Sequence, residues 1–237
     1  PARVRPASPP QRAYPLYLDP MFTTKTIAAR AGTTWASALF VIFSIGLGGC
    51  ASSFQSERQN VYDFGPGPVA NTPSPASVKF APLILGLIES SPALESKTVN
   101  YRLNYAIGQQ LKPYSQARWS MEPAQLLRQR LSEQLGPTRT ILNPGESGTA
   151  GAEAPATLRV NLEEFSQLFL TPSESVGLIR LRATLIQPSK TPRVTQHSIV
   201  VQRPAPSANA IGGVQALTQA TAAALLEVDQ WLRVQAP

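Results

Sequence analysis

The sequence has very little cysteine and histidine: its 237 residues contain one of each, Cys50 and His197. A single cysteine excludes an intramolecular disulfide framework. A structural zinc ion takes four ligands, mostly cysteine sulfur and histidine nitrogen, so one cysteine and one histidine are too few for such a site. We therefore expect no metal and no cofactor, and the lone cysteine needs another explanation.

Clustered positive charge is also missing, although the formal net charge is +7. Residues 1–49 carry five basic side chains and one acidic side chain, so they account for more than half of the excess. No run of four or more basic residues occurs in the chain. Because binding to phosphates needs clustered charge, we predict that the protein does not bind nucleic acid.

The 17 residues from Ala31 to Leu47 contain no charged side chain. They follow a basic region with Lys25 and Arg30, and the sequence Leu47-Gly48-Gly49-Cys50 ends the stretch. A basic start, an apolar centre and small residues before a cleavage point form the layout of a secretory signal, and the stretch is shorter than the roughly 20 residues of a spanning helix. The small residues before Cys50 resemble a bacterial lipobox, in which the cysteine thiol accepts a diacylglyceryl group.

Lipidation of Cys50 would anchor the mature chain without a segment that spans the bilayer, because three acyl chains hold a protein to a bilayer more firmly than one. Ala51 and Ser52 follow the cysteine in place of the aspartate that typically retains such lipoproteins at the inner membrane. We therefore expect a periplasmic protein anchored to the outer membrane. The alternative is a buried free cysteine beside a membrane anchor.

The chain divides into four parts on this interpretation. We interpret residues 1–20 as upstream sequence from an over-extended gene call, with Met21 as the start, and 21–49 as the lipoprotein signal peptide. Residues 50–76 are the acylated N-terminus and a proline-rich tether, and 77–237 are the folded domain.

The folded part predicts an α/β domain. Leu127, Leu131 and Leu135 recur four residues apart after Ser120, a candidate N-cap, and Gly136 ends this helix. The predicted strands are 61–65, 78–88, 98–107, 139–143, 157–170, 175–187 and 193–203, and the predicted helices are 120–135 and 207–234. This order favours a single domain with one mixed β-sheet flanked by helices.

Several short motifs point to a known family. They are Tyr101-Arg102-Leu103-Asn104-Tyr105, Leu111-Lys112-Pro113-Tyr114, Ala117-Arg118-Trp119-Ser120-Met121-Glu122-Pro123 and Val200-Val201-Gln202-Arg203-Pro204. With the lipobox, this set resembles the ABC-type transport auxiliary lipoproteins, a family that includes the lipoprotein component of the paraquat-inducible intermembrane transport system. The resemblance implies a domain similar to the N-terminal domain of TolB. It also implies a transporter with an ATPase, an ABC permease and a substrate-binding protein with an MCE domain, which moves lipid or other hydrophobic molecules across the envelope.

Tyr114, Arg118 and Trp119 are the candidate contacts to a partner or ligand, because they come just before a predicted helix N-terminus. A guanidinium and an indole at that place can bind a carboxylate or a lipid headgroup. The alternative is that Trp119 packs under the helix and Arg118 covers it.

No group of residues in the sequence predicts catalysis. His197 lies in a predicted strand without a nucleophile turn or a second histidine. Glu163 and Glu164 are adjacent on a strand, so we expect them to face opposite ways and not to act as a pair.

The main hypothesis is a non-enzymatic lipoprotein, tethered through Cys50, that docks an MCE-type transport assembly to a membrane; we also consider a homo-oligomer around that assembly. The first alternative is a stand-alone periplasmic lipoprotein that binds a hydrophobic molecule, with the apolar strand 80–88 as a pocket wall. An enzyme is the third alternative.

Overall fold

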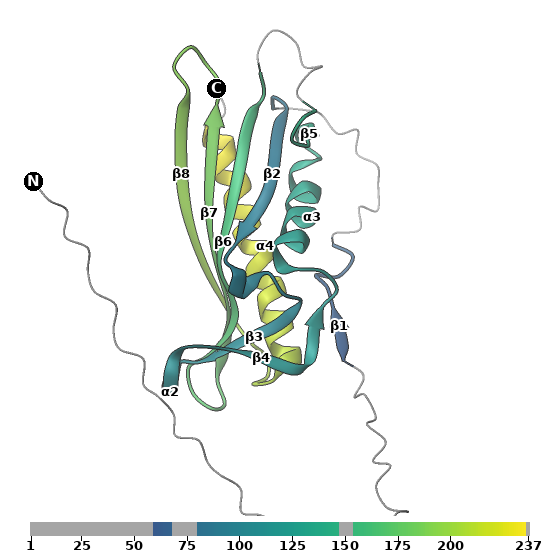
Figure 1. The fold of residues 1–237 in the computed structure, drawn as a ribbon, viewed down its shortest axis with the longest axis vertical. Coiled ribbons are helices and arrows are strands. Elements are labelled where there is room, and N and C mark those ends of the chain that lie inside the picture. The colour runs from purple at the N-terminus through teal and green to yellow at the C-terminus, as the bar shows by residue number, and fades with distance from the viewer. Residues whose placement is uncertain (1–58, 68–79, 147–153, 236–237) are drawn as a thin grey trace, which may run out of the picture. The chain divides into compact units, whose positions relative to one another are not determined.

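Eight strands pair into one mixed β-sheet in the computed structural model, which describes residues 59–67, 80–146 and 154–235. The predicted signal peptide, Cys50 and most of the tether lie outside these residues. Figure 1 shows the elements in chain order: β1 (Asn60–Tyr62), β2 (Leu83–Ser90), the 3₁₀ helix η1 (Pro92–Leu94), β3 (Thr98–Leu103), α2 (Asn104–Ile107), β4 (Gly108–Trp119), α3 (Pro123–Leu135), β5 (Ile141–Leu142), β6 (Ala156–Phe169), β7 (Ser175–Gln187), β8 (Arg193–Pro204) and α4 (Ala210–Gln235).

Strand β6 organises the sheet. Along one edge it pairs antiparallel with β7 from Thr157 to Phe169. Its other edge is shared: the first half pairs in parallel with β2, and residues 167–169 pair in parallel with β3. Strands β4 and β1 extend the sheet beyond β3, and β8 extends it beyond β7.

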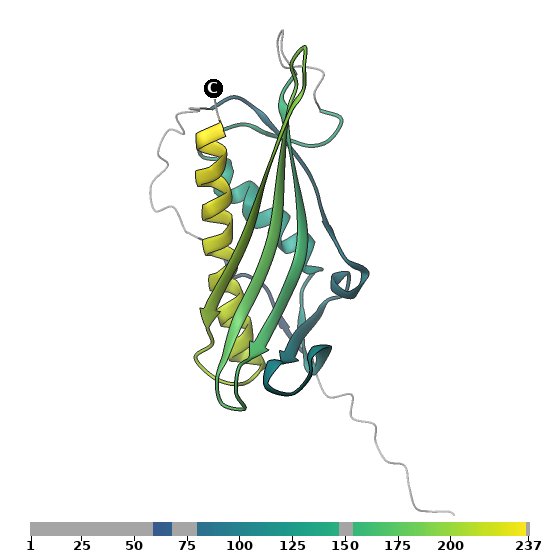
Figure 2. The same cartoon turned by 90° about the vertical axis from the view of Figure 1, so that its left-hand side faces the viewer.

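The long helix α4 and helix α3 lie on the same face of the sheet (Figure 2). This arrangement follows from the alternation in β7, where Ile179, Leu181 and Ala183 are buried while Arg180 and Arg182 are exposed. A half-buried strand of this kind needs a cover on one side only. The prediction of one mixed sheet with flanking helices is confirmed.

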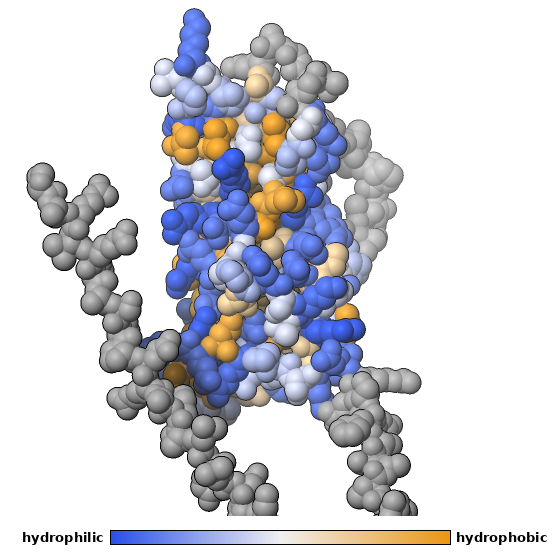
Figure 3. Space-filling model, in the orientation of Figure 1, coloured by the Kyte–Doolittle hydropathy of each residue, from blue (hydrophilic) through white to orange (hydrophobic). Residues whose placement is uncertain are grey.

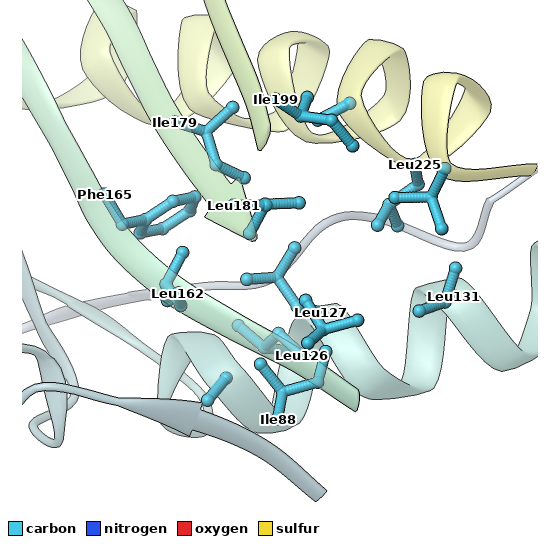
Figure 4. Packing of buried hydrophobic residues seen from close by; sticks show 14 of the residues in the cluster. Ile88, Leu126, Leu127, Leu131, Leu162, Phe165, Ile179, Leu181, Ile199 and Leu225 are labelled. Atoms are coloured by element: carbon cyan, nitrogen blue, oxygen red, sulfur yellow. The ribbon is translucent and has the colours of Figure 1, made fainter. Parts of the chain in front are cut away.

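The core lies between the sheet and the two helices. Leu127, Leu131 and Leu135 of α3 are fully buried, and α4 adds Leu225 from the other helix (Figure 4). Alanines on the buried face of α4 let the helix approach the sheet closely. At Gly177 of β7 there is no room for a side chain, because a β-carbon there would lie 2.5 Å from the backbone of Ala216.

Strand β4 was not predicted, and the strand expected at 98–107 is shorter. The β4 segment is polar and contains Pro113, which removes a backbone donor. Strand β4 forms because β3 and β1 pair with it on its two sides. The chain leaves β3 at Leu103 and makes the single turn α2, so Tyr105 lies in a turn and not in a strand.

Helix α3 begins later than its sequence predicts. Its N-cap is Glu122, and Pro123 occupies the first turn, where a missing N–H costs nothing. The backbone N–H of Ser120 donates instead to the carbonyl of Tyr62, 2.7 Å away, which ties the end of β4 to β1. The prediction of Ser120 as the N-cap is therefore wrong, although the leucine stripe and the end at Gly136 are confirmed.

Candidate interaction surface

Arg118 and Trp119 are neighbours on β4 and face opposite sides of the sheet. Trp119 is 1% exposed and packs against Phe64 and Phe165, with ring centroids 5.5 Å from each. Arg118 is exposed to solvent. The indole is thus a core side chain, as in the packing alternative, but the guanidinium does not cover it.

Arg118 belongs to a surface at the edge of the sheet. Its register partner on the edge strand β1 is Val61, which is 52% exposed. Within the described part of the chain, no carboxylate forms a salt bridge with Arg118. An exposed cation beside an exposed apolar side chain is available to bind a carboxylate or a phosphate.

Tyr114 is partly buried and belongs to a polar cluster under the first turns of α4. Its hydroxyl donates to Gln167 Oε1 at 2.8 Å, and Gln167 Nε2 donates to Ser175 Oγ at 2.7 Å. The Tyr101 ring lies 4.6 Å from that of Tyr114. Burial, with a smaller contribution from Tyr101, raises the pKa of Tyr114 to about 12. The hydroxyl therefore stays protonated and acts as a hydrogen-bond donor. Tyr114 points toward the buried Gln167, whereas Arg118 is exposed to solvent, so the two side chains do not form one surface.

Two arginines of α3 fasten neighbouring segments to the helix. Arg130 Nη2 donates to the carbonyls of Phe64 and Gly65 at 2.7 and 2.6 Å. Arg128 donates to the carbonyls of Leu85 and Gly86 at 3.3 Å, beside the irregularity in β2. The sequence places both guanidiniums away from the leucine stripe but gives no sign of these carbonyl partners, which come from distant parts of the chain.

Among the described residues, open grooves border both helices, and a smaller pocket of about 70 Å³ lies near Phe64. A groove of about 560 Å³ along α3 is lined in part by Leu87, which is exposed. A second groove, of about 470 Å³, lies between β8 and α4 and includes Val200 and Leu226. Figure 3 shows the sheet face that carries no helix, where hydrophobic side chains are scattered over a largely hydrophilic surface.

His197 and the two adjacent glutamates have surface partners. His197 Nε2 lies 3.0 Å from Glu227 Oε1, and its ring stacks on Trp231. Glu163 pairs with Arg182 at 2.6 Å and Glu164 with Arg102 at 2.9 Å.

The expectation that these glutamates face opposite ways is wrong. A register irregularity between Leu162 and Glu164 shifts the alternation of β6. Glu164 then opposes Arg180, and Glu163 pairs with Arg182, so both carboxylates lie on the sheet face that carries these exposed arginines. Each is engaged by a guanidinium.

A buried charged cluster joins the C-terminal ends of α3 and α4. Arg139 is almost fully buried over the Phe80 ring, with its guanidinium carbon 4.9 Å from the ring centroid. Burial lowers the pKa of Arg139 from its ordinary value, partly offset by Asp229. Asp229 accepts a hydrogen bond from Arg233 at 2.8 Å. The guanidinium carbon of Arg233 lies 5.5 Å from the centroid of the same Phe80 ring. Arg139 and Arg233 therefore meet over Phe80, a proximity that their sequence spacing does not reveal.

The described residues contain no group of three or more histidine, cysteine, aspartate or glutamate side chains placed to hold a metal ion. In the same residues, no helix combines the length and apolar character needed to cross a bilayer.

Comparison with known proteins identifies both sequence and fold relatives. The sequence profile of the family described as "ABC-type transport auxiliary lipoprotein component" matches residues 62–228. A crystal structure from Xanthomonas campestris, assigned to family DUF330, is 20% identical, with a TM-score of 0.56 over 73% of this chain and 94% of that one. A second, of an uncharacterized protein, is 16% identical, with a TM-score of 0.55 over 74% of this chain and 99% of that one. No curated protein matches the sequence. At these identities the two structures show the fold.

Proposed function

The chain belongs to the family of ABC-type transport auxiliary lipoprotein components, and from this membership we propose that it is a non-enzymatic, membrane-anchored subunit of an ABC-type transporter. The observation that carries the proposal is the family match, which covers residues 62–228 and so nearly the whole described domain. The domain contributes a surface for binding, while transport requires a permease and an ATPase on other chains.

The anchor is the lipidated Cys50. The support is the sequence: the only cysteine of the chain follows Leu47-Gly48-Gly49 at the end of an uncharged apolar stretch. Ala51 and Ser52 favour the outer membrane, with the domain on its periplasmic face. The partner in this proposal is an MCE-domain substrate-binding protein, and the cargo is a lipid or another hydrophobic molecule.

Arg118 with its neighbour Val61 is the contact that we propose for this partner. Both are exposed on the strand pair β1 and β4, at the edge of the sheet. An arginine without a protein carboxylate can bind one on a partner with two parallel hydrogen bonds. Tyr114 supports this surface indirectly, because its bond to Gln167 links β4 to β6 across the intervening strand β3.

A stand-alone carrier of a hydrophobic molecule is the alternative function. The alternative needs the apolar strand 80–88 to line a pocket, but Leu83 and Leu85 of that strand are 2% and 1% exposed in the protein core. Ligand pockets have volumes of about 300–1,000 Å³ and enclose most of the ligand. Among the described residues, the pocket near Phe64 measures about 70 Å³, and the groove of about 560 Å³ that Leu87 of this strand lines is open to solvent along α3.

The test is capture of partners from membranes after mild crosslinking, followed by mass spectrometry. We expect an MCE protein to be recovered with the wild-type chain and lost with Cys50→Ala. Arg118→Ala, in a chain that is still lipidated, should lower recovery, while Arg193→Ala, an exposed arginine on the opposite edge strand β8, should not. Efficient acylation without any transporter component in the capture would contradict the proposal. Crosslinked species of this chain alone would report the homo-oligomer.

A further inference from the structure

Four large apolar side chains are exposed together at one end of the domain. They are Tyr105 and Ile107 in α2, Leu170 after β6 and Ile211 in the first turn of α4, with exposed fractions of 48, 60, 43 and 55%. We call this group the apolar tip. It is built from three connections that are distant in sequence, so no single local motif explains why all three expose large apolar side chains.

The pairing of the strands places these connections side by side. Leu103, the last residue of β3 before α2, pairs with Phe169, the last residue of β6 before Leu170. The start of α4 lies against the same strand end, because Gly213 closely approaches Gln167. In Figures 1 and 2 the connections all lie at the lower end of the domain, opposite the β7–β8 hairpin.

The start of the described domain lies toward the same end. Tyr62 of β1 pairs with Trp119, and Trp119 packs on Phe165. Phe165 is four residues from the end of β6 near the apolar tip and nine residues from the start of that strand. β1 therefore lies closer to the tip than to the far end of the sheet, in agreement with its place in Figure 1.

The length of chain before β1 limits which end can reach a membrane. Ten Cα steps separate Cys50 from Asn60, and at about 3.4 Å per step they reach at most about 34 Å. At about 3.3 Å per residue, Phe165 lies about 13 Å from the tip end of β6 and about 30 Å from its other end. The β7–β8 hairpin lies farther still, because the β7–β8 pairing continues to Gln187 and Arg193, past the last pair of β6 at Thr157. A chain anchored at Cys50 can thus bring the tip onto the bilayer with length to spare, whereas the hairpin lies at the limit of its reach.

We propose that the apolar tip is seated on the phospholipid surface to which Cys50 is anchored, with Tyr105, Ile107, Leu170 and Ile211 in the interfacial layer. This inference rests on the lipid anchor of the proposed function. A tyrosine is well suited to such a position, since its ring is apolar and its hydroxyl remains at the headgroups. The tip supplies a second attachment besides the acyl chains and fixes the orientation of the domain, so that the β7–β8 hairpin points away from the membrane.

The test measures contact with acyl chains at the two ends of the lipidated protein. Acylated Cys50 has no free thiol, so Ile107→Cys at the tip and Val194→Cys near the far hairpin each add a unique labelling site. The two positions are matched in chemistry and exposure, at 60 and 57%. Each variant carries an environment-sensitive fluorophore and is reconstituted in phosphatidylethanolamine–phosphatidylglycerol vesicles, with or without bromine on the acyl chains. Circular dichroism checks that both variants are folded.

We expect bromine to quench the label at position 107 about fivefold more than the label at 194, because an interfacial side chain lies 5–10 Å deep, at the acyl boundary. Equal, weak quenching at both positions in acylated, vesicle-bound protein would overturn the orientation alone. Quenching confined to position 194 would reverse it. If the emission of the label at position 107 shifted only when an MCE partner was added, the tip would be a binding surface for that protein, and the inference would also be overturned. If mass spectrometry found no acyl chains on the protein and the protein did not float with the vesicles, the lipid anchor would be refuted, and the proposed orientation with it.

Discussion

Replacement of Trp119 by alanine tests whether this residue belongs to the core or to a binding surface. The indole is 1% exposed and packs between Phe64 and Phe165. Removal of such a side chain costs about 3–5 kcal/mol, from lost burial and from the cavity left behind. For a domain of this size each kcal/mol lowers Tm by about 2–4 °C, so we expect Trp119→Ala to lower Tm by about 6–20 °C.

The measurement is thermal and urea unfolding followed by circular dichroism, with Arg118→Ala as the matched control. Arg118 is the adjacent residue but faces solvent, so its replacement should change the unfolding free energy by no more than about 0.5 kcal/mol. Trp119→Phe should cost less than half as much as the alanine variant, because the indole N–H has no hydrogen-bond partner among the described residues and phenylalanine keeps most of the ring contacts. If Arg118→Ala were as destabilising as Trp119→Ala, or if Trp119→Ala shifted Tm by less than about 2 °C, the assignment of these two side chains to opposite faces would be wrong.

Two further predictions concern the polar contacts of α3 and β4. Arg130→Ala should lower the urea unfolding free energy by about 1–2 kcal/mol, because charged hydrogen bonds to the Phe64 and Gly65 carbonyls are lost; Gln129→Ala on the same helix is the control, and equal effects would contradict the role of Arg130. Burial raises the pKa of Tyr114 from an ordinary 10.0 to about 12, so folding favours the protonated hydroxyl. This contribution to the free energy of unfolding is complete below pH 10.0 and is lost as the pH rises to about 12. Unfolding free energies across that range should fall less for Tyr114→Phe than for the wild type, and tyrosinate absorbance should lose its latest-titrating component; identical pH dependences would refute the burial of this hydroxyl.

Local sequence patterns identify most of the fold. Strand β7 is predicted from 175 to 187 and found from Ser175 to Gln187, because its alternating side chains meet a helix on one face and solvent on the other. Helix α4 is likewise evident from apolar residues three or four apart, although it begins at Ala210 after Asn209, whose side chain accepts from the Gly212 N–H. These elements have a single strong periodicity, so they can be found without tertiary information.

Strand β4 shows where such patterns fail. It is polar, contains Pro113 and lacks regular alternation, and its conformation depends on pairing with β1 and β3. The interaction surface depends on the same pairing. Sequence adjacency suggests that Arg118 and Trp119 act together, whereas strand geometry sends their side chains to opposite faces.

The sequence by itself determined the class of the domain, its two amphipathic helices, the candidate lipidation site at Cys50 and the family resemblance, because these depend on local composition, periodicity and short motifs. Only the tertiary structure decided that β2 and β3 share one edge of β6, that Arg130 holds the Phe64 and Gly65 carbonyls, and that three separate connections form one apolar tip. Each of these features joins residues far apart in the chain. Their proximity follows from the packing of the whole sheet against α3 and α4, which no local window of sequence contains.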